Sequence, residues 1–127
     1  MPKTILVDTD VLVDYLRDYP PAVEYLESRH EDLSTSAVVV AELYVGVREG
    51  KERTALNALL SLFEVIPIDA TLAERGGLLR RDFGPKHGTG LADALIAATA
   101  QQTGAELATL NAKHFPMLQN VTVPYKK

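Results

Sequence analysis

The chain has 127 residues, no cysteine and a formal net charge of −4, with 46% hydrophobic and 24% charged residues. This size and composition predict one soluble globular domain over residues 1–127 and exclude disulfides and thiolate metal sites. The acidic net charge argues against a protein that binds nucleic acid through overall positive charge. It is compatible with an enzyme that binds nucleic acid through a local basic rim. Residues 1–7 are too short for a signal peptide and no apolar run reaches about 18 residues, so we expect a cytoplasmic protein without membrane spans.

Short apolar runs alternate with helical periodicities along the chain. Strands are expected at residues 3–7, 32–35, 64–68, 105–110 and 120–124. Helices are expected at residues 9–18, 22–29, 36–49, 51–63, 69–83 and 91–104. Thr9 is expected to be the N-cap of the first helix. Pro20 separates the first two helices, and Gly50 and Gly104 end the third and the last. Residues 84–90 (GPKHGTG) are expected to form a loop.

The alternation of strands and helices is typical of an α/β fold. We predict a three-layer α/β/α architecture with a central, mainly parallel sheet of four to five short strands. In such sheets, ligands bind beyond the carboxyl ends of the strands. Asp8 and Asp10 directly follow the first predicted strand, so a functional site is expected there.

Three acidic residues each stand almost alone in an apolar stretch. Asp8 follows a buried-strand pattern, Glu42 is the single charge in residues 37–47 (AVVVAELYVGV), and Asp93 is the single charge in residues 90–100 (GLADALIAATA). A helix that is apolar all round, as residues 37–47 would be, is predicted to be buried. A buried carboxylate is costly without a partner, and these stretches contain no lysine or arginine. We therefore predict that Asp8, Glu42 and Asp93 meet around one or two Mg²⁺ or Mn²⁺ ions, which prefer oxygen ligands.

Each acid also has a simpler interpretation when it is taken alone. Asp8 could be a helix N-cap, Glu42 could point to solvent from a partly exposed helix, and Asp93 could be a first-turn acid favoured by the helix dipole. The occurrence of all three together favours the metal site. Asp14 is expected to be a solvated helix residue, whereas Asp10 could support the metal indirectly or bind a second ion.

Four segments, in this order and spacing, resemble the PIN-domain ribonucleases. They look most like the VapC-type toxins of bacterial and archaeal toxin–antitoxin pairs. The segments are residues 5–16 (ILVDTDVLVDYL), 36–47 (SAVVVAELYVGV), 90–100 (GLADALIAATA) and 107–115 (LATLNAKHF). Each motif is weak alone, but the ordered set is specific, and the resemblance extends over nearly the whole chain.

The resemblance implies a PIN-like fold and metal-dependent endonucleolytic hydrolysis of RNA, with tRNA among the candidate substrates. It also implies a cognate antitoxin partner and a homodimer. The three acids of the family correspond to Asp8, Glu42 and Asp93, as catalytic residues and as ligands of Mg²⁺ or Mn²⁺. Lys113 and His114, near the expected mouth of the site, are candidates for contact with the RNA backbone.

The chain departs from the family pattern at one position. Many PIN domains carry a fourth acid after the fourth strand, where this chain has Asn111, so a tight second metal site is placed in doubt. Asp10 could restore some of the missing charge. Thr9 and Thr109 could position a water or a phosphate with their hydroxyls, and capping is an equally good interpretation of both.

Two other functions fit part of the sequence. Residues 5–13 (ILVDTDVLV) also fit the D-x-D-x-[TV] motif of haloacid-dehalogenase-like phosphatases, in which Asp8 would be the nucleophile and Asp10 a general acid. That mechanism needs a later acidic pair for Mg²⁺, whereas residues 88–95 (GTGLADAL) hold a single acid. The other alternative is a non-catalytic PIN-like binding module, against which the retained acids argue.

Overall fold

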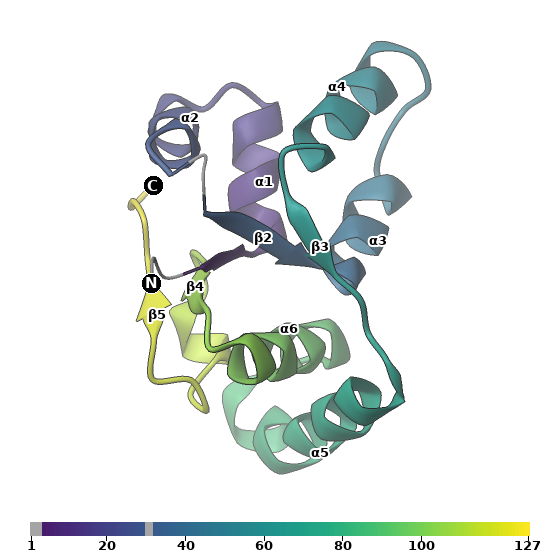
Figure 1. Ribbon diagram of the computed structural model, residues 1–127. Helices are drawn as coiled ribbons and strands as arrows, with labels where there is room; N and C mark the ends of the chain where they lie inside the picture. Colours follow the sequence, from purple (N-terminus) through teal and green to yellow (C-terminus); the bar gives the residue numbers. More distant parts are fainter. Residues whose placement is uncertain (1–3, 30–31) are drawn as a thin grey trace.

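Five short strands form one parallel sheet in the order β3-β2-β1-β4-β5 (Figure 1). The computed structural model describes residues 4–29 and 32–127, so the start of the first predicted strand at Lys3 lies outside the described residues. The strands are β1 (Ile5–Val7), β2 (Leu33–Ser36), β3 (Glu64–Ile66), β4 (Glu106–Ala108) and β5 (Val121–Thr122). The four pairings are all parallel, and Ile5 lies opposite Leu33 on one side and Glu106 on the other.

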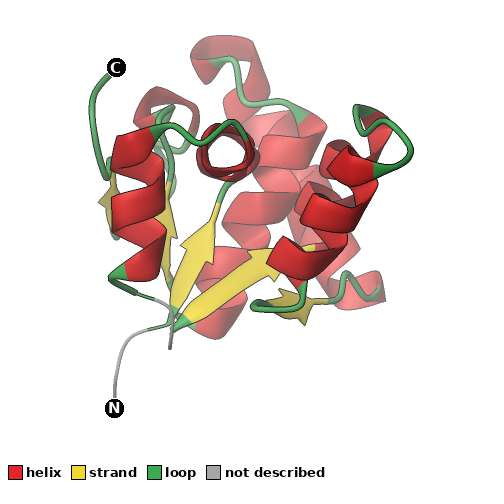
Figure 2. Cartoon of the chain, turned by 90° about the horizontal axis from the view of Figure 1, so that it is seen from above, coloured by secondary structure: helices red, strands yellow, loops and turns green. Residues whose placement is uncertain are grey.

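Helices cover both faces of this sheet. They are α1 (Thr9–Leu16), α2 (Pro20–Glu27), α3 (Ala37–Val45), α4 (Lys51–Leu60), α5 (Ala70–His87) and α6 (Leu91–Thr103), followed by the short 3-10 helix η1 (Ala112–His114). In Figure 1, α1 and α2 lie above the sheet, and α5 and α6 pack together below it. Figure 2 shows the strands fanning out among the helices. The predicted three-layer α/β/α fold with a parallel sheet is confirmed.

Strand β1 lies at the centre of the core, because it is paired on both edges and covered on both faces. Ile5, Leu6 and Val7 are each at most 1% exposed. Strands buried on both faces are built from continuous aliphatic runs, which explains the sequence of this segment. The burial continues into Asp8, the residue at the carboxyl end of β1, which is only 6% exposed.

Helices α1 and α3 differ from their predictions. The N-cap of α1 is Asp8, whose carboxylate accepts a hydrogen bond from the backbone N–H of Thr9, so the prediction of Thr9 as N-cap is wrong. Helix α3 ends at Val45, four residues before the predicted end. The prediction that it is buried all round is also wrong, since Val39 and Leu43 are buried but Val45 is 88% exposed. The helix packs against β2, β3, α1, α4 and α6.

Helix α5 extends through part of the predicted loop at residues 84–90. It continues to His87 and ends at Gly88, whose φ of +68° is the left-handed conformation that favours glycine. Pro85 lies in the last turn of α5 and is exposed. As a proline it has no backbone N–H to donate to the preceding turn. In the described part of the chain, no helix is long and apolar enough to cross a membrane.

Candidate active site

The candidate site lies at the carboxyl end of β1, where Asp8 leaves the sheet and caps α1. The two carboxylate oxygens of Asp8 have different donors. Oδ1 accepts a hydrogen bond from Thr9 N at 2.7 Å, and Oδ2 accepts one from Thr109 Oγ1 at 2.8 Å. Thr109 directly follows β4 and is completely buried. The neighbouring ends of β1 and β4 thus hold this carboxylate in a fixed orientation.

Asp8 is electrostatically strained. Its pKa is raised from the ordinary 3.8 to about 7, chiefly by burial and then by the negative charge of Asp10. The hydrogen bonds from Thr109 and Thr9 lower it, and the charge of Asp93 raises it further. The buried end of β1 therefore lacks the positive charge that an ionised Asp8 requires.

Glu42 reaches the same region from α3. Its Oε1 accepts a hydrogen bond from Thr9 Oγ1 at 2.7 Å, so Thr9 contacts Asp8 through its backbone and Glu42 through its hydroxyl. The Glu42 side chain is exposed, which agrees with the simpler interpretation of its position. Thr9 is therefore a positioning residue between two of the three predicted acids.

Asp93 lies in the first turn of α6, as its simpler interpretation expected. Its Oδ2 is 3.5 Å from Gly90 N and 3.3 Å from His114 Nδ1. Its charge contributes to the raised pKa of Asp8, which places it within electrostatic range of that carboxylate. The contact with His114 was not predicted, because no local pattern shows that η1 folds back onto the start of α6.

Asp10 has a structural role in this arrangement. Its Oδ1 accepts a hydrogen bond from Val11 N at 2.8 Å and its Oδ2 accepts one from Leu110 N at 3.0 Å. Asp10 therefore ties the first turn of α1 to the chain that leaves β4. Burial raises its pKa, while these two backbone hydrogen bonds lower it.

The remaining predicted residues lie around this edge of the sheet. Asn111 is exposed, and its backbone N–H donates to Thr109 Oγ1 at 3.0 Å, so its main chain supports the residue that binds Asp8. Lys113 is exposed on η1, while His114 is partly buried beside Asp93. Asp8, Glu42 and Asp93 thus border one region, but within residues 4–29 and 32–127 no three His, Asp or Glu side chains lie close enough to hold a metal ion together.

Asp14 corrects another prediction. It was expected to be solvated, but it is only 4% exposed, and its carboxylate accepts hydrogen bonds from Tyr125 Oη at 2.7 Å and Lys127 Nζ at 3.0 Å. These bonds attach the segment after β5 to α1. The available signal was the spacing of four residues from Asp10, which places both carboxylates on one side of the helix.

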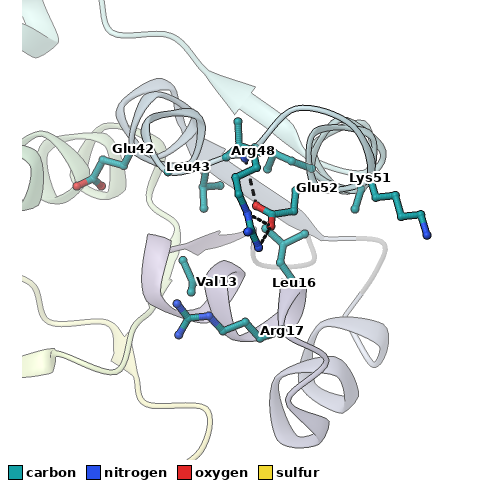
Figure 3. A pocket seen from close by; sticks show the side chains of 12 residues that line it. Val13, Leu16, Arg17, Glu42, Leu43, Arg48, Lys51 and Glu52 are labelled. Carbon is teal, nitrogen blue, oxygen red and sulfur yellow. Dashed lines mark hydrogen bonds and ion pairs between the residues drawn. The ribbon is translucent and has the colours of Figure 1, made fainter.

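A groove runs between α1, α3 and α4 and has a volume of about 640 Å³. Its apolar lining includes Val13, Leu43 and Leu56, and Arg48 and Glu52 form an ion pair at 2.6 Å across its wall. Glu42 stands at one end, with its carboxylate pointing away from this ion pair (Figure 3). The groove therefore ends beside one of the candidate site acids.

An all-parallel sheet with acidic side chains at the carboxyl end of its central strand has its site where open α/β sheets bind ligands. The family model of the PIN domain matches residues 5–117, and the chain belongs to this family. It is 42% identical to ribonuclease VapC10 of Mycobacterium tuberculosis over 95% of this chain and 92% of the relative. It is 39% identical to ribonuclease VapC19 of the same organism, over 94% of this chain and 98% of the relative.

A solved structure gives the same picture. The toxin–antitoxin complex from Klebsiella pneumoniae contains a chain that superimposes with a TM-score of 0.82 at 30% identity, over 98% of this chain and all of that chain. The predicted resemblance to PIN-domain ribonucleases of the VapC type is therefore confirmed, in fold and in enzyme class.

Proposed function

We propose that this chain is a Mg²⁺- or Mn²⁺-dependent endoribonuclease and the toxin of a type II toxin–antitoxin pair, with Asp8, Glu42 and Asp93 as its metal-binding and catalytic acids. The observation that carries the metal site is the Asp8 carboxylate, which is buried at a strand end with a pKa raised to about 7. The ribonuclease activity is supported by relatives that bear that name and align over nearly the whole chain.

The donor chemistry of the three acids fits a hard divalent cation. All three acids offer oxygen donors, and Mg²⁺ and Mn²⁺ prefer such ligands. Among the described residues, no lysine or arginine forms an ion pair with any of the three. When bound, the cation would polarise a phosphoryl oxygen and lower the pKa of a bound water. Glu42 and Asp93 are less buried than Asp8, so their side chains have room to turn toward it.

The chain itself supplies orientation. Thr109 and Thr9 hold the two oxygens of Asp8, and Thr9 also holds Glu42. With a cation bound, Asp8 and Asp93 would hold it, and Glu42 would complete the metal shell or orient the attacking water. We propose that Lys113, which is exposed on η1, contacts the RNA backbone. RNA substrates, tRNA among them, would be selected by loop contacts and RNA shape.

The groove between α1, α3 and α4 is the proposed binding site for the antitoxin. Its apolar lining and its end at Glu42 suit an amphipathic helix that places a basic side chain beside the acids. The Klebsiella pneumoniae neighbour is a toxin–antitoxin complex by its description, which supports a partner of this kind. We also propose a homodimer, because the family resemblance implies one and because Val45 of α3 and Leu62 after α4 expose 88% and 60% of their surface. Light scattering that gives only monomer at micromolar concentration would contradict the dimer.

The alternatives have less support. A phosphatase mechanism needs Asp10 as a free general acid, but both of its oxygens accept backbone hydrogen bonds. A non-catalytic module would need Asp8 only as the cap of α1, a role that serine or asparagine fills without burying a carboxylate.

The experiment is cleavage of total cellular RNA, including tRNA, by the purified chain with Mg²⁺ or Mn²⁺. We expect fragments that disappear in EDTA and return when the metal is restored. Cleavage that resists EDTA would contradict the metal mechanism. If borohydride traps an aspartyl-phosphate and the RNA stays intact, the result would support the phosphatase and contradict the nuclease. Failure to bind Mg²⁺ or Mn²⁺ at millimolar concentration in calorimetry would favour the binding module.

A further inference from the structure

The partner of Asp93 is His114, a residue separated from it by the rest of α6 and by β4. Their side chains are 26% and 29% exposed, and His114 Nδ1 is 3.3 Å from Asp93 Oδ2. The other nearby donor, Gly90 N, approaches the same oxygen at 3.5 Å. In the described part of the chain, no group donates a hydrogen bond to Oδ1. The carboxylate thus has one oxygen facing the protein and one available to a ligand.

The backbone of His114 is itself held at two points. Its carbonyl oxygen accepts a hydrogen bond from Thr89 Oγ1 at 2.7 Å, and Thr89 is only 1% exposed. Its N–H donates to the carbonyl oxygen of Asn111 at 3.0 Å. The ring lies beside Gly88, where an added Cβ would be 3.7 Å from Nε2. The turn between α5 and α6 and the turn after β4 therefore fix the imidazole next to Asp93.

We propose that His114 is a positioning residue for Asp93, in which Nδ1–H donates to Oδ2 and turns Oδ1 toward the cation. The separation of 3.3 Å is that of an ion-pair contact, slightly longer than an ordinary hydrogen bond, so the proposed donation requires the imidazole and the carboxylate to move slightly closer and into line. Such outer donors orient metal-binding carboxylates, and their loss typically weakens metal affinity about 10- to 100-fold. This role differs from the RNA contact predicted for His114, and it rests on the proposed metal site.

Substitutions that place an amide N–H at the position of one ring nitrogen or of the other test this role. His114→Asn places an amide N–H where Nδ1 was, His114→Gln places it where Nε2 was, and His114→Ala supplies neither. We expect the Mn²⁺ dissociation constant, measured by calorimetry, to rise about 10-fold or more in the Ala and Gln variants and to stay within about threefold of wild type in the Asn variant. The exposed His87→Ala on α5 is the matched control and should bind Mn²⁺ as the wild type does.

The tautomer of His114 gives a readout that needs no metal. In the metal-free protein at pH 8, ¹⁵N NMR of the imidazole should show the proton on Nδ1. A proton on Nε2 would overturn the proposal. So would equal Mn²⁺ affinity in all three folded variants and wild type, or an Asn variant as weak as the Ala variant. If the wild type binds no Mn²⁺, the proposed function fails, and the tautomer still decides whether His114 donates to Asp93.

Discussion

Replacing Asp8 by asparagine should make the metal-free protein more stable at alkaline pH. The carboxylate is buried, and its pKa is raised from 3.8 to about 7, first by burial and then by the charge of Asp10. The folded protein therefore retains a proton up to about pH 7 that the unfolded chain releases near pH 4. Because the folded state binds more protons in this window, stability is full below about pH 4 and falls as the pH rises through 7.

The size of the effect follows from the two pKa values. A difference of about three pKa units, at about 1.36 kcal/mol each, corresponds to a loss of about 4 kcal/mol by pH 8. Asp8→Asn removes this loss and keeps the helix cap, since asparagine caps as well as aspartate. We therefore expect the free energy of unfolding of the variant to exceed that of wild type by up to about 4 kcal/mol at pH 8, and the advantage to shrink toward pH 4.

Urea unfolding in EDTA at several pH values between 4 and 8 measures this difference. The control is Asp82→Asn, which also removes one negative charge but lies exposed beside Arg81. It should leave the pH dependence of the wild type in place. An Asp8→Asn variant that is no more stable than wild type at pH 8, or whose advantage grows toward low pH, would refute the argument that an uncompensated charge lies at the end of β1.

Three further outcomes follow from the same structure. Mn²⁺ should raise the thermal midpoint of the wild type and raise it less in Asp93→Asn; equal shifts would contradict a shared metal site. Asp14→Asn should lower the free energy of unfolding by about 1–3 kcal/mol, because it weakens the bonds from Tyr125 and Lys127 at a buried position, and a neutral result in urea would contradict that role. Gly76→Val should lower the free energy of unfolding by about 1–3 kcal/mol, because a Cβ there would lie 2.5 Å from a Leu95 methyl carbon. The control Gly77→Ala has open space around it and should raise the free energy of unfolding slightly. The reverse order would contradict the close packing of α5 and α6.

The fold could be predicted because its signals are local. The aliphatic run of β1 and the helical spacing of apolar residues in α1, α4 and α6 are patterns among residues that are close in sequence. The end of α5 could not be placed, because Gly84 and Pro85 are typical of turns, whereas the helix continues past them to His87. The exposure of Val45 depends on how far α3 extends beyond the sheet, which no local pattern encodes.

The candidate site was predictable in composition more than in geometry. Asp8 and Asp93 were singled out as lone charges in apolar stretches, and the structure brings them within electrostatic range of each other. The donors around them were harder to foresee. The contact of His114 with Asp93 and the burial of Asp14 depend on chain segments that return from far away in the sequence. The assignment of the acids as metal ligands stays a prediction.

The most direct test is cleavage of total cellular RNA by wild type and Asp8→Asn at equal concentration, with Mg²⁺ or Mn²⁺, after circular dichroism has shown that both are folded. In Asp8→Asn, an amide nitrogen replaces one carboxylate oxygen. This keeps the shape of the side chain but removes a full charge from the proposed metal shell. We predict metal-dependent fragments from the wild type and none from Asp8→Asn, with toxic expression of the first and harmless expression of the second. An Asp8→Asn protein that cleaves as well as the wild type would contradict the account.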